Sequence, residues 1–247
     1  MATDLLLEHS HNTVTQSINE YGDSFEVARH RCRCWFCPSC CEVMGYRLRK
    51  KLIPILDTFS GLLLVTLTVD PTLFPDPKSA YFYIRERRCI ARTIQDLLRW
   101  GYLNSHRYFY VVEWQKTTEQ AHFHVLLDAS FIPFHRLLES WSKHRPQNAG
   151  PVVKDRPAFG TVLISKPNFA GGPAHAACYV TKYLTKVPAH GFPEWVLQTG
   201  KDTRMRRYSA SRGFWGTVPE KAEADGTRVR EATTYAERIR GCGASVD

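Results

Sequence analysis

Residues 107–130 read RYFYVVEWQKTTEQAHFHVLLDAS, and this stretch decides the fold. Residues 107–115 and 121–130 are rich in aromatic and β-branched side chains, which is typical of strands. The polar residues 116–120 between them fit a reversal of the chain, although they lack the Asn-Gly pair of a tight turn. The stretch therefore predicts a β-hairpin with two histidines on its second strand.

The segments around this hairpin alternate between strand and helix patterns. We predict strands at 61–69 and 160–167, and helices at 79–103, 133–144 and 171–187. The resulting order, strand, helix, strand, strand, helix, strand, helix, predicts an α+β sandwich with an antiparallel sheet. The sequence divides into an N-terminal extension (1–28), a cysteine-rich segment with a basic helix (29–52), the main domain (53–218) and a charged tail (219–247).

Composition narrows the class of partner. Hydrophobic residues make up 43% of the 247 residues, which predicts a packed core. The longest apolar run is too short to span a bilayer, and the N-terminus lacks a secretory signal, so we expect a soluble cytoplasmic protein with no membrane contact. The net charge of +9 favours a polyanionic partner, most often nucleic acid.

His122 and His124 are two residues apart, so on a strand their side chains share one face and Phe123 takes the other. Paired imidazoles suit a divalent cation. Glu113 on the partner strand of the hairpin could complete a set of two histidines and one carboxylate, with positions left for a substrate. The alternative is a chance pair of surface or core histidines.

Tyr179 and Tyr183 lie four residues apart in the stretch YVTKYLTK, so on a helix they share a face. Lys182 and Lys186 repeat this offset on a neighbouring strip. Two phenols beside two ammonium groups could attack and hold a phosphate, if a metal and a lysine activate the weakly nucleophilic hydroxyl. The alternative is a helix with its tyrosines toward the core and its lysines in solvent.

Five cysteines fall in one ten-residue window, which without a secretion signal favours metal over disulfides. Cys34, Cys37 and Cys40 have zinc-ligand spacing, and the fourth ligand could be Cys32, Cys41 or His30. No second pair of ligands follows, so reduced structural cysteines are the alternative.

Residues 204–215 read RMRRYSASRGFW and interleave arginines with aromatic side chains. Arginines neutralise phosphates, and aromatic faces stack exposed bases. The predicted DNA-binding residues are Arg204, Arg206, Arg207, Arg212 and Trp215. The alternative is a solvated loop whose aromatic side chains cap the core.

Taken in order, LLVTLTVDP (63–71), HFHVLL (122–127) and YVTKYLTK (179–186) resemble the three motifs of rolling-circle replication initiators of the HUH endonuclease superfamily. The two tyrosines resemble the two-tyrosine branch of small single-stranded DNA phages, and RRYSASRGFW is similar to a segment of phage and plasmid replication proteins. The resemblance covers roughly residues 30–216.

This resemblance implies a ferredoxin-like, split βαβ fold, with the histidines on a central strand that faces the tyrosine helix. It implies cleavage and rejoining of single-stranded origin DNA through a 5′-phosphotyrosine and a free 3′-hydroxyl. His122 and His124 would bind Mg²⁺ or Mn²⁺ with Glu113 as a third ligand, Tyr179 and Tyr183 would attack, and Lys182 and Lys186 would hold phosphate. Thr66, Thr68 and Asp70 match the first motif as strand scaffold.

The same resemblance implies partners and a location. No GxxxxGK[ST] loop occurs in the sequence, so a host helicase and polymerase are the expected partners, in the cytoplasm of a bacterial host. Two other functions stay open: a relaxase or transposase of the same superfamily, and a non-catalytic DNA-binding protein that contains zinc.

Overall fold

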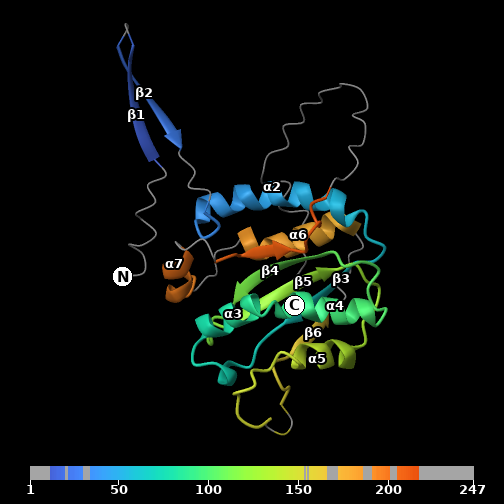
Figure 1. Ribbon diagram of the computed structural model, residues 1–247. Coiled ribbons are helices and arrows are strands. Elements are labelled where there is room, and N and C mark those ends of the chain that lie inside the picture. Colours follow the sequence, from blue (N-terminus) through green and yellow to red (C-terminus); the bar gives the residue numbers. More distant parts are fainter. Residues whose placement is uncertain are drawn as a thin grey trace, which may run out of the picture.

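A five-stranded antiparallel sheet forms the centre of the molecule (Figure 1). The structure is a computed structural model, and it describes residues 12–19, 22–29, 34–152, 154, 156–165, 172–185, 191–200 and 205–216. The strand order is β6-β3-β5-β4-β7. The strands are β3 (Leu63–Leu67), β4 (Tyr108–Trp114), β5 (Ala121–Leu127), β6 (Val162–Ser165) and β7 (Tyr208–Ala210).

Helices cover both faces of this sheet (Figure 1). On one face lie α3 (Pro77–Glu86), α4 (Cys89–Arg99) and α5 (Phe134–Ser142), which pack on Phe123 and Val125. On the other face lie α2 (Pro38–Leu56) and α6 (Gly172–Thr185), which pack on Leu64 and Leu126. Because successive strand residues point to opposite faces, the central strands supply both cores and are buried on both sides. The predicted α+β architecture is confirmed.

The hairpin that opened the sequence analysis joins β4 to β5. Tyr108 pairs with Leu127 at one end of the ladder, and Trp114 pairs with Ala121 at the other. β3 lies antiparallel to β5 on its other side, with Thr66 opposite His124. β5 is thus the middle strand, so its side chains are held by neighbours on both edges.

The helix predicted at 79–103 is instead two helices. It breaks at Arg88, which has a left-handed backbone with φ of 54°. A single helix of that length would extend about 37 Å, whereas a seven-residue strand covers only about 23 Å. Two shorter helices, α3 and α4, can each lie on the sheet.

Some elements were not predicted from the sequence. Residues 1–28 were expected to be a featureless extension, but β1 (Asn12–Asn19) and β2 (Gly22–Arg29) form a two-stranded antiparallel hairpin. A 3₁₀ turn, η1 (Pro71–Leu73), follows β3, and α7 (Glu194–Gly200) and β7 are short elements between α6 and the end of the described chain. The tail from 219 onward lies outside the described residues.

The α2 helix lies tightly against α6. It begins at Pro38, inside the cysteine window, whereas the sequence predicted a helix only after that window. Proline is well suited to the first turn of a helix because the N–H that it lacks would have no partner there. At Gly45 a Cβ atom would lie 2.2 Å from the Thr185 side chain, so only glycine permits this approach. The Arg49 Nε also donates to Thr181 Oγ1, at 3.1 Å.

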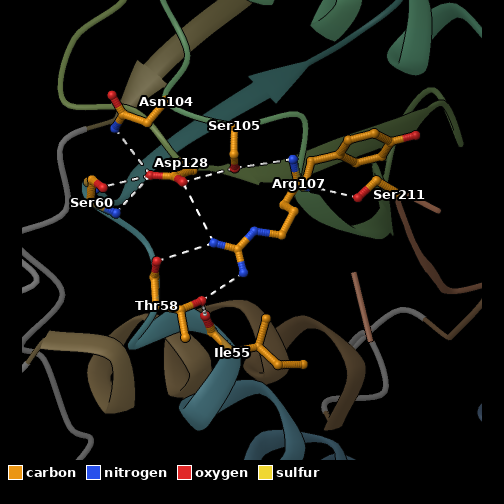
Figure 2. Close-up of polar contacts among 10 residues, drawn as sticks. Ile55, Thr58, Ser60, Asn104, Ser105, Arg107, Asp128 and Ser211 are labelled. Atoms are coloured by element: carbon orange, nitrogen blue, oxygen red, sulfur yellow. Dashed lines mark hydrogen bonds and ion pairs between the residues drawn. The ribbon is translucent and has the colours of Figure 1, made fainter. Parts of the chain in front are cut away.

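A buried carboxylate closes the end of β5 that lies farthest from the histidines (Figure 2). Asp128 is 3% exposed. Its carboxylate accepts hydrogen bonds from four groups, at 2.9–3.2 Å: the N–H of Ser60, the N–H of Gly61, the amide of Asn104 and the hydroxyl of Ser105. The Arg107 guanidinium lies 3.9 Å away and donates to Thr58 Oγ1 at 2.7 Å. This cluster ties together the chain segments that enter β3 and β4.

Candidate active site

His124 lies between polar partners on both neighbouring strands. Its Nδ1 is 3.0 Å from Thr66 Oγ1 on β3, and its Nε2 is 2.9 Å from Glu113 Oε2 on β4. An ionised carboxylate only accepts hydrogen bonds, so Nε2 carries the proton here and the Thr66 hydroxyl donates to Nδ1. Two side chains therefore fix the orientation of the imidazole ring.

His122 lies directly opposite Glu113 in the ladder, although the Glu113 carboxylate contacts His124 diagonally. Burial and the nearby His124 lower the pKa of His122 despite the opposing effect of Glu113. Burial would raise the pKa of Glu113, but the hydrogen bond from His124 and the positive charges of His124, His122 and Lys182 outweigh it and lower that pKa. The cluster therefore favours a charged carboxylate beside a neutral His122.

The tyrosine helix α6 packs over these histidines. The Tyr183 ring stacks on the His124 ring with centroids 4.0 Å apart and planes 10° apart. The Tyr183 hydroxyl donates to the Tyr179 hydroxyl at 3.4 Å. Lys182 Nζ lies 3.8 Å from the Tyr179 ring centroid and 5.0 Å from that of Tyr183. The helix predicted from the sequence thus brings both phenols and one ammonium to the two histidines.

The pKa of Tyr183 is raised, first by burial, then by its hydrogen bond to Tyr179 and by the negative charge of Glu113. A phenol in this setting keeps its proton at neutral pH. Attack by this hydroxyl would therefore need a positive group or a proton acceptor that arrives with the substrate.

The donor chemistry at His124 and Glu113 fits a divalent cation. Two ligands about 2.1 Å from one ion, at a right angle, lie about 3 Å apart, and the 2.9 Å Nε2–Oε2 distance matches this spacing. Glu113 is also open to solvent, with its side chain 44% exposed. His122 is not brought into the pair: within the described ranges, no group of three His, Cys, Asp or Glu side chains is placed to hold a metal.

The cysteine segment lies at the start of α2. Cys37, Cys40 and Cys41 are buried, Cys34 is half-buried, and all four are free thiols. The Cys34 Sγ accepts a hydrogen bond from the Phe36 N–H, at 3.4 Å. These four form no metal cluster in the part of the chain that the structure describes, which does not include Cys32 or His30. Zinc binding at this segment stays a prediction.

Arg207 was expected to bind DNA, but its position gives it a structural role. It is 2% exposed and so offers no surface to a phosphate. Its guanidinium donates to the main-chain oxygens of Tyr183, Leu184 (3.0 Å) and Trp35 (2.8 Å). Burial lowers the pKa of Arg207 to about 10, so it is still charged at neutral pH. The expectation of DNA contact is therefore corrected for this residue.

Arg207 is part of a complete cap on the tyrosine helix. The last four carbonyls of a helix have no partner within it. In α6 side chains bind all four: Thr185 Oγ1 binds the Lys182 oxygen at 3.3 Å, Arg207 binds those of Tyr183 and Leu184, and Cys41 Sγ binds that of Thr185 at 3.3 Å. Burial raises the pKa of Cys41 despite the nearby Arg207 charge, which suits a thiol that donates.

The other predicted DNA-binding residues divide into two groups. Arg206, Arg212 and Trp215 are exposed near β7. Arg204 lies outside the described residues, as does Lys186. Sequence reasoning missed the contacts of Thr66, Arg207 and Cys41, because each depends on residues at least 23 positions away in the chain.

Comparison with known families places the chain. The family model for replication-associated proteins of the ORF2 type matches residues 62–188, just over half of the 247 residues. The chain therefore belongs to this family of replication-associated proteins. The matched range contains the three motifs with Thr66, His122, His124 and both tyrosines. Comparison with curated proteins and with solved structures gave no match.

No helix in the described ranges is both long and apolar enough to cross a membrane. The net charge of +9 and the family both agree with a partner that is DNA.

Proposed function

We propose that this protein initiates rolling-circle replication by nicking and rejoining single-stranded DNA at an origin, as a two-tyrosine HUH endonuclease. The observation that carries the proposal is the stack of Tyr183 on His124, whose Nε2 is hydrogen-bonded to Glu113. A phenol, two imidazoles and a carboxylate meet at the surface of a sheet from three separate elements. A helix that used its tyrosines only for packing would not need this polar floor.

In the proposed reaction a tyrosine hydroxyl oxygen attacks the scissile phosphorus. The bond from phosphorus to the 3′ oxygen breaks as the new tyrosine–phosphorus bond forms, which leaves a 5′-phosphotyrosine and a 3′-hydroxyl. The phenol gives up a proton, and the departing 3′ oxygen gains one. Because the phosphotyrosine bond replaces the broken phosphodiester, the reverse attack rejoins the strand without ATP.

The residues of α6 divide the other tasks. Tyr179 and Tyr183 are close enough for their hydroxyls to exchange a hydrogen bond, so either phenol could reach a phosphate held at the histidines. The second tyrosine could then cut the regenerated origin after one round. Lys182, whose ammonium lies over both rings, would offset the charge of the phosphate, and Lys186 is proposed to assist it.

A bound Mg²⁺ or Mn²⁺ would polarise the phosphoryl group and favour attack. His124, Glu113 and His122 are the residues that would hold it. Its binding at Nε2 would move the imidazole proton to Nδ1, and the Thr66 hydroxyl can accept that proton as readily as it now donates. Thr66 thus suits His124 in either tautomer, a role that a valine in the same place could not fill.

A covalent-capture experiment tests the proposal. Purified protein is mixed with a pool of labelled single-stranded oligonucleotides of random sequence plus Mn²⁺, and complexes that survive denaturation are recovered and their DNA sequenced. We expect an adduct with one enriched sequence, absent without metal and absent in the Tyr179→Phe/Tyr183→Phe variant. Binding of single-stranded DNA without any adduct, in Mg²⁺ or Mn²⁺, would instead indicate a non-catalytic DNA-binding protein.

A further inference from the structure

A groove of about 480 Å³ runs along β7, at the edge of the sheet beyond β4. Residues on one side come from the segment that precedes α2, and those on the other come from β7 and the turn after it. The lining residues that matter here are Trp35, Arg206, Tyr208, Ser209 and Trp215. None of these belongs to the cluster around His124.

Aromatic side chains form a continuous surface in this groove. The Trp35 ring meets the Tyr208 ring edge-on at a centroid distance of 5.2 Å. Tyr208 and Trp215 both contact Phe109, at 5.5 and 6.1 Å. Trp215 is 44% exposed, and Trp35 and Tyr208 are half-buried. Half-buried rings held by their neighbours offer faces on which the bases of a single strand can stack at little cost in side-chain entropy.

The polar groups of the groove suit a nucleic acid. Its lining contains the exposed Arg206 and no aspartate or glutamate. In the ladder with β4, the Val112 N–H binds the Arg207 oxygen and the Ser211 N–H binds the Tyr108 oxygen. Because bonding alternates along an antiparallel strand, the main-chain groups of Tyr208 and Ala210 point away from β4. They are available to the edges of bases.

The groove is also tied to the tyrosine helix. Arg207, which precedes Tyr208, donates to the main-chain oxygens of Trp35 and Tyr183. Trp35, Tyr179, Tyr183 and Tyr208 all pack against the same core on the α2 and α6 face of the sheet. A strand held in the groove would therefore lie on the face of the sheet where the phenols lie.

We infer that this groove is a binding site for unpaired bases of the DNA substrate, which stack on Trp35, Tyr208 and Trp215 while Arg206 contacts a phosphate. The inference rests on the proposed function in that the same strand would continue to the tyrosines of α6. The groove would hold the strand in register and contribute affinity without taking part in the chemistry.

Binding without cleavage tests this site. The Tyr179→Phe/Tyr183→Phe variant, which cannot form an adduct, is titrated against a fluorescent single-stranded oligonucleotide without divalent metal, and anisotropy is measured. Adding Trp215→Ala should weaken binding about tenfold, the loss expected for one base stack. Adding Arg206→Ala should reduce the slope of log affinity against log salt by about 0.7, the value for one phosphate contact on a single strand. The matched control is Phe131→Ala, an exposed ring before α5, which should change neither quantity.

Photo-crosslinking with 5-iodouracil oligonucleotides locates the contact directly. We expect crosslinked peptides that contain Trp35, Tyr208 or Trp215. Unchanged affinity in both variants, or crosslinks only to other segments, would overturn the inference. The outcome is separable from the proposed function, since an adduct formed normally by the Trp215→Ala protein with wild-type affinity would remove only the groove, whereas groove binding without any adduct would remove only the cleavage.

Discussion

β5 has a polar cluster at each end, and the two clusters differ in how completely their groups are satisfied. At one end Asp128 is 3% exposed and accepts four hydrogen bonds, with Arg107 nearby (Figure 2). At the other end the side chain of Glu113 is 44% exposed, and His124 is covered by a tyrosine ring. The first cluster leaves no place for a ligand, whereas the second keeps a carboxylate open to solvent. Polarity alone therefore does not mark a functional site, but polarity combined with access to substrate does.

The largest effect is expected at the satisfied end. Asp128→Ala would leave four donors without their acceptor and Arg107 without its counter-charge, which costs about 3–5 kcal/mol when the groups are buried. Urea or guanidinium unfolding of the variant measures this loss. The control Asp57→Ala changes an exposed carboxylate after α2 and should alter stability by less than about 0.5 kcal/mol. A stability loss as small as that of the control would show that the cluster does not hold the chain segments together.

The open end should show the reverse behaviour. Glu113→Gln keeps the size of the side chain but removes its charge, so adduct formation should fall about 100-fold or more, while stability changes by less than about 1 kcal/mol. Single-turnover rates of adduct formation and a denaturation curve on the same sample give both values. Full activity in Glu113→Gln would exclude this carboxylate from the site.

An intermediate effect is expected at Arg207, which supports the open end from behind. Arg207→Lys retains the charge but loses the planar fork that reaches several carbonyls at once, and we expect a loss of about 2 kcal/mol. Hydrogen exchange should become faster in the last turn of α6, with α4 unchanged as an internal reference. If protection of that turn is the same as in the wild type, the cap has no energetic role.

The smallest effect concerns pH. The pKa of Glu113 is lower in the folded chain than the value of about 4.3 in an unfolded one, so its ionised form stabilises the fold above that value. This contribution is lost as the pH falls through the lowered folded pKa. The difference in stability between the wild type and Glu113→Gln should therefore shrink between about pH 5 and pH 3. A difference that stays constant over this range would mean that the interactions of Glu113 with His124, His122 and Lys182 do not stabilise the folded chain.

Sequence patterns predicted the elements that depend on local periodicity. The β4–β5 hairpin, the tyrosine helix and the order of strands and helices were all anticipated, because alternation along a strand and four-residue spacing along a helix are visible in short windows. The same spacing predicted that His122 and His124 share a face and that Tyr179 and Tyr183 share another. Only the pairing of β5 with its neighbours could place the two faces together.

What the sequence did not predict depends on contacts between distant segments. Nothing in RMRRYSASRGFW distinguishes Arg207, which is buried under the tyrosine helix, from the exposed Arg206 beside it. The three-residue strand β7 exists because β4 offers a free edge, and the break at Arg88 reflects the length of the sheet rather than a local signal. The role of Cys41 as a helix cap was likewise hidden by its place in a metal-like cysteine pattern.

Identifying the residue that becomes linked to DNA tests the central claim most directly. The adduct formed with captured single-stranded DNA and Mn²⁺ would be digested, and the peptide that carries the nucleotide sequenced by mass spectrometry. The account predicts a nucleotide on Tyr179 or Tyr183 of α6, and its loss in His124→Ala. A nucleotide on any other residue, or an adduct that persists in His124→Ala at the wild-type rate, would contradict it.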